Sequence, residues 1–390
     1  MKSIPVLVES SLSSVKGPVI SIGKQKLGEN KPCYIVAEIG INFDGEREKA
    51  LKMIDAAASA GCDAVKFQVF RAKRMYAKDA GKLIVATGEK VDIHQLIKEM
   101  ELPYEWLAEL KAYAESKKLE FFTSVCDEAS ADVLESVNVN AYKIASYEIT
   151  HLPLIEHVAK KHKTLIMSCG GATIQEVDEA IVTAKAAGLN DIVLMHCIAQ
   201  YNAPLDTLNL NVIRTLKSQY PELIIGYSDH SSNPVIAPVA AVSLGAKMIE
   251  KHITLDRSTP GPDHSFALEP DELKQMVLAI RQAEKDISNG KVVNVNPKVL
   301  GTTKCDTFDN EVYVRKFAYR LLYATHLIKS GEIISKKNIA VLRSGDSYKK
   351  YYYTGLHPRY YGLLTGKAKY KATRVIKVGQ AITWDDILTQ

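Results

Sequence analysis

The chain has 390 residues, of which 46% are hydrophobic and 24% charged, and its formal net charge is +5. This length suits one large domain with a smaller one, and no apolar run approaches the ~18 residues that a membrane span needs. The start of the chain lacks the charged residues and long apolar core of a secretory signal. We therefore expect a globular cytoplasmic protein with no membrane partner.

The six cysteines are scattered and form no CxxC pair. Most lie in apolar, strand-like runs or at their ends. This usage predicts reduced thiols rather than a disulfide framework or a zinc knuckle.

Charge is unevenly distributed. Residues 291–390 carry 18 Lys and Arg against 7 Asp and Glu, a net charge of +11, whereas the rest of the chain carries a net charge of −6. A basic region can bind nucleic acid, but this one has no RNA- or DNA-binding motif. We favour a cap that docks on an acidic surface or helps to hold an anionic substrate, and we expect no nucleic-acid partner.

Residues 1–32 are a weakly patterned lead-in, in which 19–22 and 24–26 suggest a small hairpin that plugs the bottom of a barrel. From Tyr34 onward, short apolar runs alternate with amphipathic helices. The predicted strands are 34–39, 64–69, 120–125, 141–145, 164–167, 191–196, 223–226 and 247–253.

Eight strand–helix units are the number in a (β/α)8 TIM barrel, which we place at residues 33–288. Small turns such as Ala60-Gly61 end the predicted helices, and residues 271–287 form the last of them. A long insertion, 71–102, follows the second strand on the active-site face, where it can line a substrate pocket.

Residues 289–315 have mixed polarity and little periodicity, which indicates a linker. Short strands and turns then follow, including the strands 317–323 and 339–342. The predicted fold is therefore α/β: a TIM barrel followed by a small β-rich domain at 316–390.

Polar residues stand where the predicted strands end. In a parallel barrel all these ends meet on one face, where ligands bind. The strand-end residues are Glu38, Lys66, Gln68, Ser124, Lys143, Ser146, Glu148, Ser168, His196, Tyr201, Ser228, His230, Glu250 and His252.

These residue types suit an anionic ligand and a metal ion. Lysines supply point charge and serines supply hydroxyl donors for an anion bearing phosphate and carboxylate groups. His230 and His252, on neighbouring strand ends, suit a divalent ion such as Mn²⁺ or Mg²⁺, although either alone could equally be a hydrogen-bonded loop residue. Lys143 could instead form a Schiff base, but the paired histidines and the Lys/Ser set argue against it.

At these residues the chain resembles the sialic acid synthase family. The matching phrases are AEIGIN (37–42), VKFQ (65–68), YKIASYE (142–148), GYSDH (226–230), EKH (250–252) and PGPDH (260–264). The C-terminal region resembles that family's antifreeze-like (SAF) domain through the phrases RSGD (343–346), GLHP (355–358) and LLTGKAK (363–369).

The resemblance implies an enzyme that condenses phosphoenolpyruvate with an N-acetylated hexose. N-Acetylmannosamine is the first choice of acceptor, and a diacetamido-trideoxyhexose of legionaminic or pseudaminic acid synthesis is the alternative. It also implies a divalent cofactor, Mn²⁺ before Mg²⁺ or Co²⁺, held by His230 and His252. Arg343 would reach the barrel of the other subunit of a domain-swapped homodimer.

The remaining roles follow the same resemblance. Glu38, Glu250 and Lys143 are assigned to the chemistry. Phosphoenolpyruvate would be held by Lys66, Ser124, Lys143, Ser146, Ser168 and Ser228. The amino sugar would face Gln68, Glu148, Tyr201, Asp263 and Arg343.

Two loops depart from the family pattern. The phrase CIAQYNAP (197–204) stands where CTSxYPAP is usual, so Ala199 replaces a polar residue expected near phosphoenolpyruvate, and SCGG (168–171) stands where STGM is usual. Two alternatives from other classes also stay open: a metal-dependent aldolase that uses pyruvate, and a non-catalytic glycan-binding relative.

Overall fold

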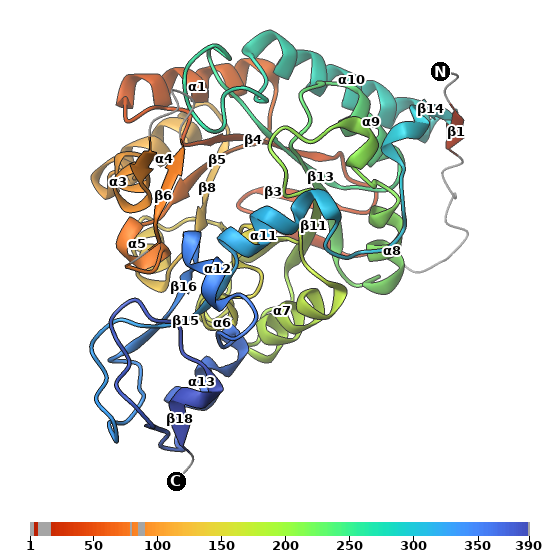
Figure 1. Ribbon diagram of the computed structural model, residues 1–390. Coiled ribbons are helices and arrows are strands. Elements are labelled where there is room, and N and C mark those ends of the chain that lie inside the picture. The colour runs from red at the N-terminus through yellow and green to blue at the C-terminus, as the bar shows by residue number, and fades with distance from the viewer. Residues whose placement is uncertain (1–3, 7–16, 79, 85–89, 389–390) are drawn as a thin grey trace.

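The computed structural model describes residues 4–6, 17–78, 80–84 and 90–388. Its centre is a closed barrel of eight parallel strands inside a ring of helices (Figure 1), as the sequence predicts. The barrel strands are β4 (Tyr34–Gly40), β5 (Ala64–Val69), β8 (Glu120–Val125), β9 (Ala141–Ile144), β10 (Thr164–Ser168), β11 (Ile192–Cys197), β12 (Ile224–Asp229) and β13 (Met248–His252).

The barrel closes where β13 pairs with β4, which places Glu250 beside Val36 and His252 beside Glu38. Almost every strand residue is buried because helices cover the outer face and side chains fill the interior. β12 continues through Ser228 and Asp229, three residues beyond the predicted end. Both polar residues are accommodated there because Ser228 faces the cavity and the buried Asp229 forms an ion pair with Lys251.

Helices alternate with these strands. Gly61 ends the first helix in the left-handed region at φ 85°, which a glycine adopts without strain, and a Thr173–Glu176 capping box begins α7. The barrel helices are α1 (Arg47–Ala60), α4 (Leu107–Ser116), α5 (Glu128–Ser136), α6 (Leu152–Ala159), α7 (Ile174–Ala186), α8 (Val212–Gln219), α9 (Ile236–Ser243) and α10 (Pro270–Ser288).

The predicted hairpin near the N-terminus is present as β2 (Val19–Ile22) and β3 (Gln25–Gly28). Its apolar residues pack in one cluster with inward-facing residues of the barrel strands, so it plugs one end of the barrel. β1 (Ile4–Val6) pairs with β14 (Val293–Val295) of the predicted linker. Residues 1–3 and 7–16 of the predicted lead-in lie outside the described residues.

The insertion after β5 folds as α2 (Ala72–Met75), β6 (Lys82–Ile84), β7 (Lys90–Asp92) and α3 (Ile93–Glu99). Its apolar residues Phe70, Met75 and Ile93 pack with Phe317, which lies far along the chain. The insertion therefore joins the barrel to the C-terminal region.

The C-terminal region forms a small lobe beside the barrel (Figure 1). Helix α11 (Val312–Ala318) runs across the predicted linker boundary and lies against the carboxyl end of the barrel. The lobe has its own apolar core. Its other elements are β15 (Arg320–Ala324), β16 (Ile339–Arg343), α12 (Tyr348–Tyr351), α13 (Tyr361–Thr365), β17 (Lys371–Ala372) and β18 (Ile387–Leu388).

All six cysteines are free and buried. Within the described part of the chain, no helix combines the length and the apolar character needed to cross a membrane.

Candidate active site

One cavity at the carboxyl end of the barrel, with a volume of about 370 Å³, gathers all the candidate site residues except His196. They come from seven of the eight strands or the residues just after them, from the loops after β11 and β13, and from β16 of the C-terminal lobe. The candidate residues that line it are Glu38, Lys66, Gln68, Ser124, Lys143, Ser146, Glu148, Ser168, Tyr201, Ser228, His230, Glu250, His252, Asp263 and Arg343.

Two buried ion pairs lie inside this cavity. Nζ of Lys66 lies 2.8 Å from Oε2 of Glu38, and Nζ of Lys143 lies 3.0 Å from both carboxylate oxygens of Glu250. Lys66 is also 3.6 Å from Oε1 of Glu250, so the pairs form one network. All four side chains are almost fully buried. Burial requires such charge pairing, and it leaves two ammonium groups in place for an arriving anion.

The two carboxyl groups have pKa values shifted in opposite directions. Burial raises the pKa of Glu38, and Lys66 offsets this only in part. Burial acts in the same sense on Glu250, but Lys143 and Lys66 prevail and lower its pKa to about 2. Carboxyl groups with separated pKa values suit different tasks: one can transfer a proton while the other stays ionised.

Hydroxyl groups surround the ion pairs. Ser124 Oγ accepts a hydrogen bond from Lys66 at 2.9 Å, and Ser228 Oγ donates one to Glu250 at 3.1 Å. The buried hydroxyl of Ser168 has no hydrogen-bond partner among the described residues. A buried polar group without a partner is costly, and a bound anion would satisfy it.

His230 and His252 lie side by side, with ring centroids 5.5 Å apart. Nδ1 of His230 donates to the carbonyl oxygen of Ile198 at 2.8 Å, so Nε2 carries the free lone pair. The buried Nδ1 of His252 has no hydrogen-bond partner among the described residues and lies 3.6 Å from Oδ2 of Asp263. Burial lowers the pKa of both histidines, that of His230 to about 4. Both imidazoles are therefore neutral at pH 7, which is the form that binds metals.

This histidine pair fits a divalent ion. A metal-binding histidine usually donates its other N–H to a carbonyl or carboxylate, as His230 does. Among the described residues, however, no group of three or more His, Cys, Asp and Glu is arranged to hold a metal. A bound ion would therefore complete its coordination with substrate oxygens and water, as Mn²⁺ and Mg²⁺ readily do.

Three residues predicted to face the sugar add polar groups to the cavity. Gln68 Nε2 donates to Oε1 of Glu38 at 2.9 Å. Tyr201 is 43% exposed and stacks on His230 with the ring centroids 4.4 Å apart. Burial raises the pKa of Asp263 to about 7.

Glu148 and Arg343 lie in the wall between the barrel and the C-terminal lobe. Oε1 of Glu148 accepts from Nη2 of Arg343 at 2.6 Å and from Nη2 of Arg320 at 3.0 Å. Glu148 and Arg320 are fully buried. Arg320 also donates to the carbonyl oxygen of Cys126 at 2.8 Å. Arg320 was not among the predicted site residues, because its one sequence signal is its place in the basic region. Arg343 was expected to reach another subunit, but here it reaches the barrel of its own chain.

One end of the cavity is apolar, a feature that was not among the predictions from the sequence. The insertion contributes Met75, Ile97 and Met100, as its length and position predict, and α11 contributes Val314 and Phe317. The helix α11 lies where a linker with little periodicity was expected, so its contribution had no clear sequence signal.

Two residues have a different place from the one expected. His196 does not line the cavity: its Nε2 donates to the carbonyl oxygen of Leu208 at 2.8 Å, and its ring stacks on Tyr227. Ala199 was expected near phosphoenolpyruvate, but it also lies outside the lining, and its N–H donates to Glu311 at 2.6 Å. His196 points away because side chains alternate along a strand, and its neighbour Cys197 is the β11 residue that lines the cavity.

His196 gives a testable dependence of stability on pH. Burial lowers its pKa from the usual 6.5 to about 4, so the unfolded chain binds the extra proton first as pH falls. Roughly 3 kcal/mol of stability should therefore be present above pH 6.5 and be lost progressively toward pH 4. We expect His196→Gln, which keeps a donor for the Leu208 carbonyl, to flatten this part of the profile in urea unfolding. An unchanged acid slope would contradict the buried neutral state of His196.

The fold and the cavity define a (β/α)8-barrel enzyme. The chain belongs to the NeuB family, whose profile matches residues 53–292.

Individual relatives match over three quarters or more of the chain. The chain is 48% identical to the spore coat polysaccharide biosynthesis protein SpsE of Bacillus subtilis, over 94% of this chain and 96% of that protein. The crystal structure of SpsE superposes with a TM-score of 0.84, covering 95% of this chain and 99% of that one. The N,N'-diacetyllegionaminic acid synthase of Legionella pneumophila is 34% identical, over 94% and 97%. A crystal structure of N-acetylneuraminic acid synthetase from Leptospira borgpetersenii in complex with citrate has a TM-score of 0.63 and 32% identity, covering 76% of this chain and 95% of that one.

Proposed function

We propose that this protein condenses phosphoenolpyruvate with an N-acetylated hexose to give a nine-carbon sialic-type acid and phosphate. The observation that carries the proposal is one cavity in which two buried lysines, four serines and two neutral histidines meet. The family and the names of the relatives, which include a legionaminic acid synthase and a sialic acid synthetase, support the same reaction.

Phosphoenolpyruvate would bind over the ion-pair network. Lys66 and Lys143 supply positive charge for its phosphate and carboxylate groups. The hydroxyls around them supply hydrogen bonds, and the unpartnered Ser168 gains one. The serines proposed for this role are Ser124, Ser146, Ser168 and Ser228.

His230 and His252 would hold the divalent metal, for which Mn²⁺ is the first choice. The metal would act as a Lewis acid on the sugar aldehyde. C3 of phosphoenolpyruvate attacks the aldehyde carbon, and a cationic centre develops at C2. Ionised Glu250 stabilises that centre. Glu38, whose pKa is raised, accepts a proton from the water that adds at C2. Phosphate then leaves by C–O cleavage, and Lys143 stabilises it.

Loss of either metal-binding histidine should abolish the metal site. We expect His230→Ala and His252→Ala each to lose Mn²⁺ binding and phosphate release, because two imidazoles are the only ligands proposed from this chain. The measurement is free Mn²⁺ by electron paramagnetic resonance, with circular dichroism as the control for folding. Full activity of either variant in chelator would contradict the metal role.

N-Acetylmannosamine is the first acceptor to test. A second candidate, a diacetamido-trideoxyhexose, is favoured by the apolar end of the cavity, where Met75, Met100 and Phe317 offer no partner to a sugar hydroxyl. A hydroxyl buried there without a hydrogen bond costs about 1–3 kcal/mol.

Phosphate release across a panel of acceptors decides between these candidates. If the apolar end selects the acceptor, kcat/KM for a diacetamido-trideoxyhexose should exceed that for N-acetylmannosamine about 10–100-fold. A Phe317→Ser variant should narrow that ratio. Equal or better use of N-acetylmannosamine by the unmodified protein would assign that sugar as the acceptor.

The assembly and location are further parts of the proposal. The opposite charges of the barrel and the C-terminal region suit a domain-swapped homodimer, in which the contacts that each basic lobe makes here with its own barrel would be made with the partner's barrel instead. The lobe, with its short strands, is proposed to be an SAF domain. Six buried free thiols suit the reducing cytoplasm.

A further inference from the structure

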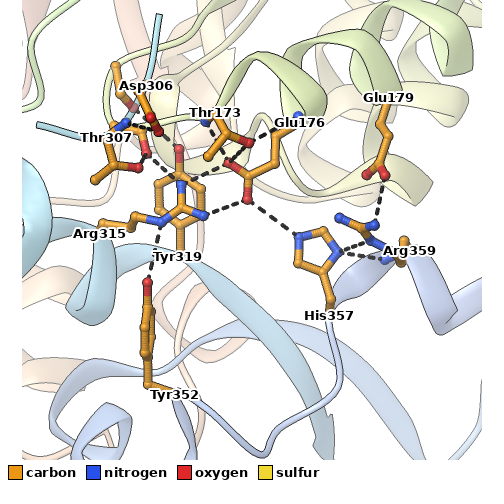
Figure 2. Close-up of polar contacts among 12 residues, drawn as sticks. Thr173, Glu176, Glu179, Asp306, Thr307, Arg315, Tyr319, Tyr352, His357 and Arg359 are labelled. Carbon is orange, nitrogen blue, oxygen red and sulfur yellow. Dashed lines mark hydrogen bonds and ion pairs between the residues drawn. The ribbon is translucent and has the colours of Figure 1, made fainter.

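The segment before the C-terminal lobe is fastened to the loop after β10 and to helix α7 of the barrel. Thr307 Oγ1 donates to the carbonyl oxygen of Gly171 at 2.8 Å, and Arg315 donates to the same oxygen at 2.5 Å. Arg315 also forms two hydrogen bonds with Glu176 of α7, at 2.6 and 2.8 Å (Figure 2). The short helix η5 (Asp309–Glu311) lies between these anchors, so the backbone that carries Glu311 is held on both sides.

The carboxyl group of Glu311 is buried against the loop after β11. Oε1 accepts from the N–H of Ala199 at 2.6 Å, and Oε2 accepts from the N–H of Phe308 at 3.1 Å. The side chain is fully buried. Its carboxyl group is therefore fixed by its own helix as well as by the barrel loop.

The N–H of Ala199 and the carbonyl group of Ile198 belong to the same peptide unit. The oxygen of that carbonyl is the acceptor, at 2.8 Å, for Nδ1–H of His230. One rigid peptide plane thus connects the Glu311 carboxyl to the His230 imidazole. A hydrogen bond at its N–H end strengthens the carbonyl as an acceptor at its other end, since hydrogen bonds in a chain polarise one another.

We infer that Glu311 is a positioning residue that fixes the tautomer and orientation of His230 through the 198–199 peptide, so that Nε2 faces the cavity with its lone pair free. This role deepens the proposed function, and its effect on metal binding rests on the metal site proposed above. The loop after β10 lies close to this arrangement: a methyl group at Gly171 would make ordinary van der Waals contact, at 3.8 Å, with the Cβ atoms of both Ala199 and Glu311.

The tautomer can be measured without metal or substrate. Long-range ¹H–¹⁵N spectra of the full chain labelled at histidine, with the His230 signals assigned from His230→Gln, report which ring nitrogen carries the proton. We expect the Nδ1–H form of His230 in the unmodified protein. Glu311→Ala should shift it toward a mixture of the two tautomers, and Glu311→Gln, which keeps an acceptor for Ala199, should restore it in large part.

A matched control separates the positioning of His230 by Glu311 from the attachment of segment 307–315 to the barrel. Thr307→Val removes one anchor without touching the 198–199 peptide, so the tautomer should stay unchanged. In titrations with Mn²⁺ alone, Glu311→Ala should weaken binding about 10–100-fold, as loss of a ligand's supporting partner does. An unchanged tautomer in Glu311→Ala, or an equal change in Thr307→Val, would overturn the inference. A tautomer shift without any Mn²⁺ binding in the unmodified protein would confirm the positioning role and refute the proposed metal site.

Discussion

Lys143→Met should reduce phosphate release from phosphoenolpyruvate by at least about 10²–10³-fold in kcat/KM. Lys143 supplies one of the two buried cations, and its loss removes charge stabilisation from the departing phosphate. It also leaves Glu250 without its nearest partner at 3.0 Å. The pKa of Glu250, which Lys143 and Lys66 hold at about 2 against the effect of burial, should then rise. Initial rates of phosphate release with saturating Mn²⁺ and acceptor measure the effect.

Lys251→Met is the matched control for the loss of a buried lysine. Nζ of Lys251 pairs with Asp229 at 2.6 Å, and the side chain is fully buried but does not line the cavity. This variant should lose thermal stability and yet retain most of its activity below its unfolding temperature. Comparable activity losses in both variants would mean that destabilisation, rather than lost chemistry at Lys143, causes the effect.

Glu148→Ala should destabilise the protein by about 3–5 kcal/mol, the usual result of breaking a buried ion pair from one side. The change leaves Arg320 and Arg343 buried without a counter-charge, at the contact between barrel and lobe. Urea unfolding should therefore show a large loss of stability. The KM for the acceptor should rise as well, because Arg343 loses the carboxylate that holds it in the cavity wall.

Glu179→Ala tests whether the loss of stability in Glu148→Ala is large because the ion pair is buried, rather than because it joins barrel and lobe. Glu179 pairs with Arg359 at 2.9 Å across the same contact between barrel and lobe (Figure 2), but both side chains are about one-third exposed or more. Exposed pairs contribute about 1 kcal/mol or less. If Glu148→Ala lost no more stability than Glu179→Ala, the result would contradict a stabilising role for the buried contacts of Glu148 with Arg320 and Arg343.

The barrel and the members of the candidate site could be predicted because both follow from local patterns. Buried strands are continuous apolar runs, and the ends of parallel strands meet on one face. Lys66 and Lys143 therefore come together even though 77 residues separate them in the sequence. The resemblance to a known family added the residues beyond the strands, such as Asp263 and Arg343, which line the same cavity.

The contacts between the C-terminal region and the barrel could not be predicted in the same way. Glu311, Arg315 and Arg320 act through partners that lie more than 100 residues away, and no periodicity in the segment marks them. A buried carboxyl group bound to backbone N–H groups looks like an ordinary surface glutamate in the sequence. The direction in which a strand-end side chain points could not be predicted either. His196 lies at the end of a strand as His230 does, yet it donates to the carbonyl oxygen of Leu208 outside the cavity.

The stoichiometry of the reaction tests the central claim most directly. Phosphoenolpyruvate consumed, phosphate released and nine-carbon acid formed would be measured together, by enzymatic assay and mass spectrometry, with Mn²⁺ and the best acceptor of the panel. We expect one phosphate and one acid for each phosphoenolpyruvate consumed, and no product from pyruvate. An acid formed from pyruvate without phosphate would identify an aldolase instead, and no turnover of any acceptor would point to a non-catalytic glycan-binding protein.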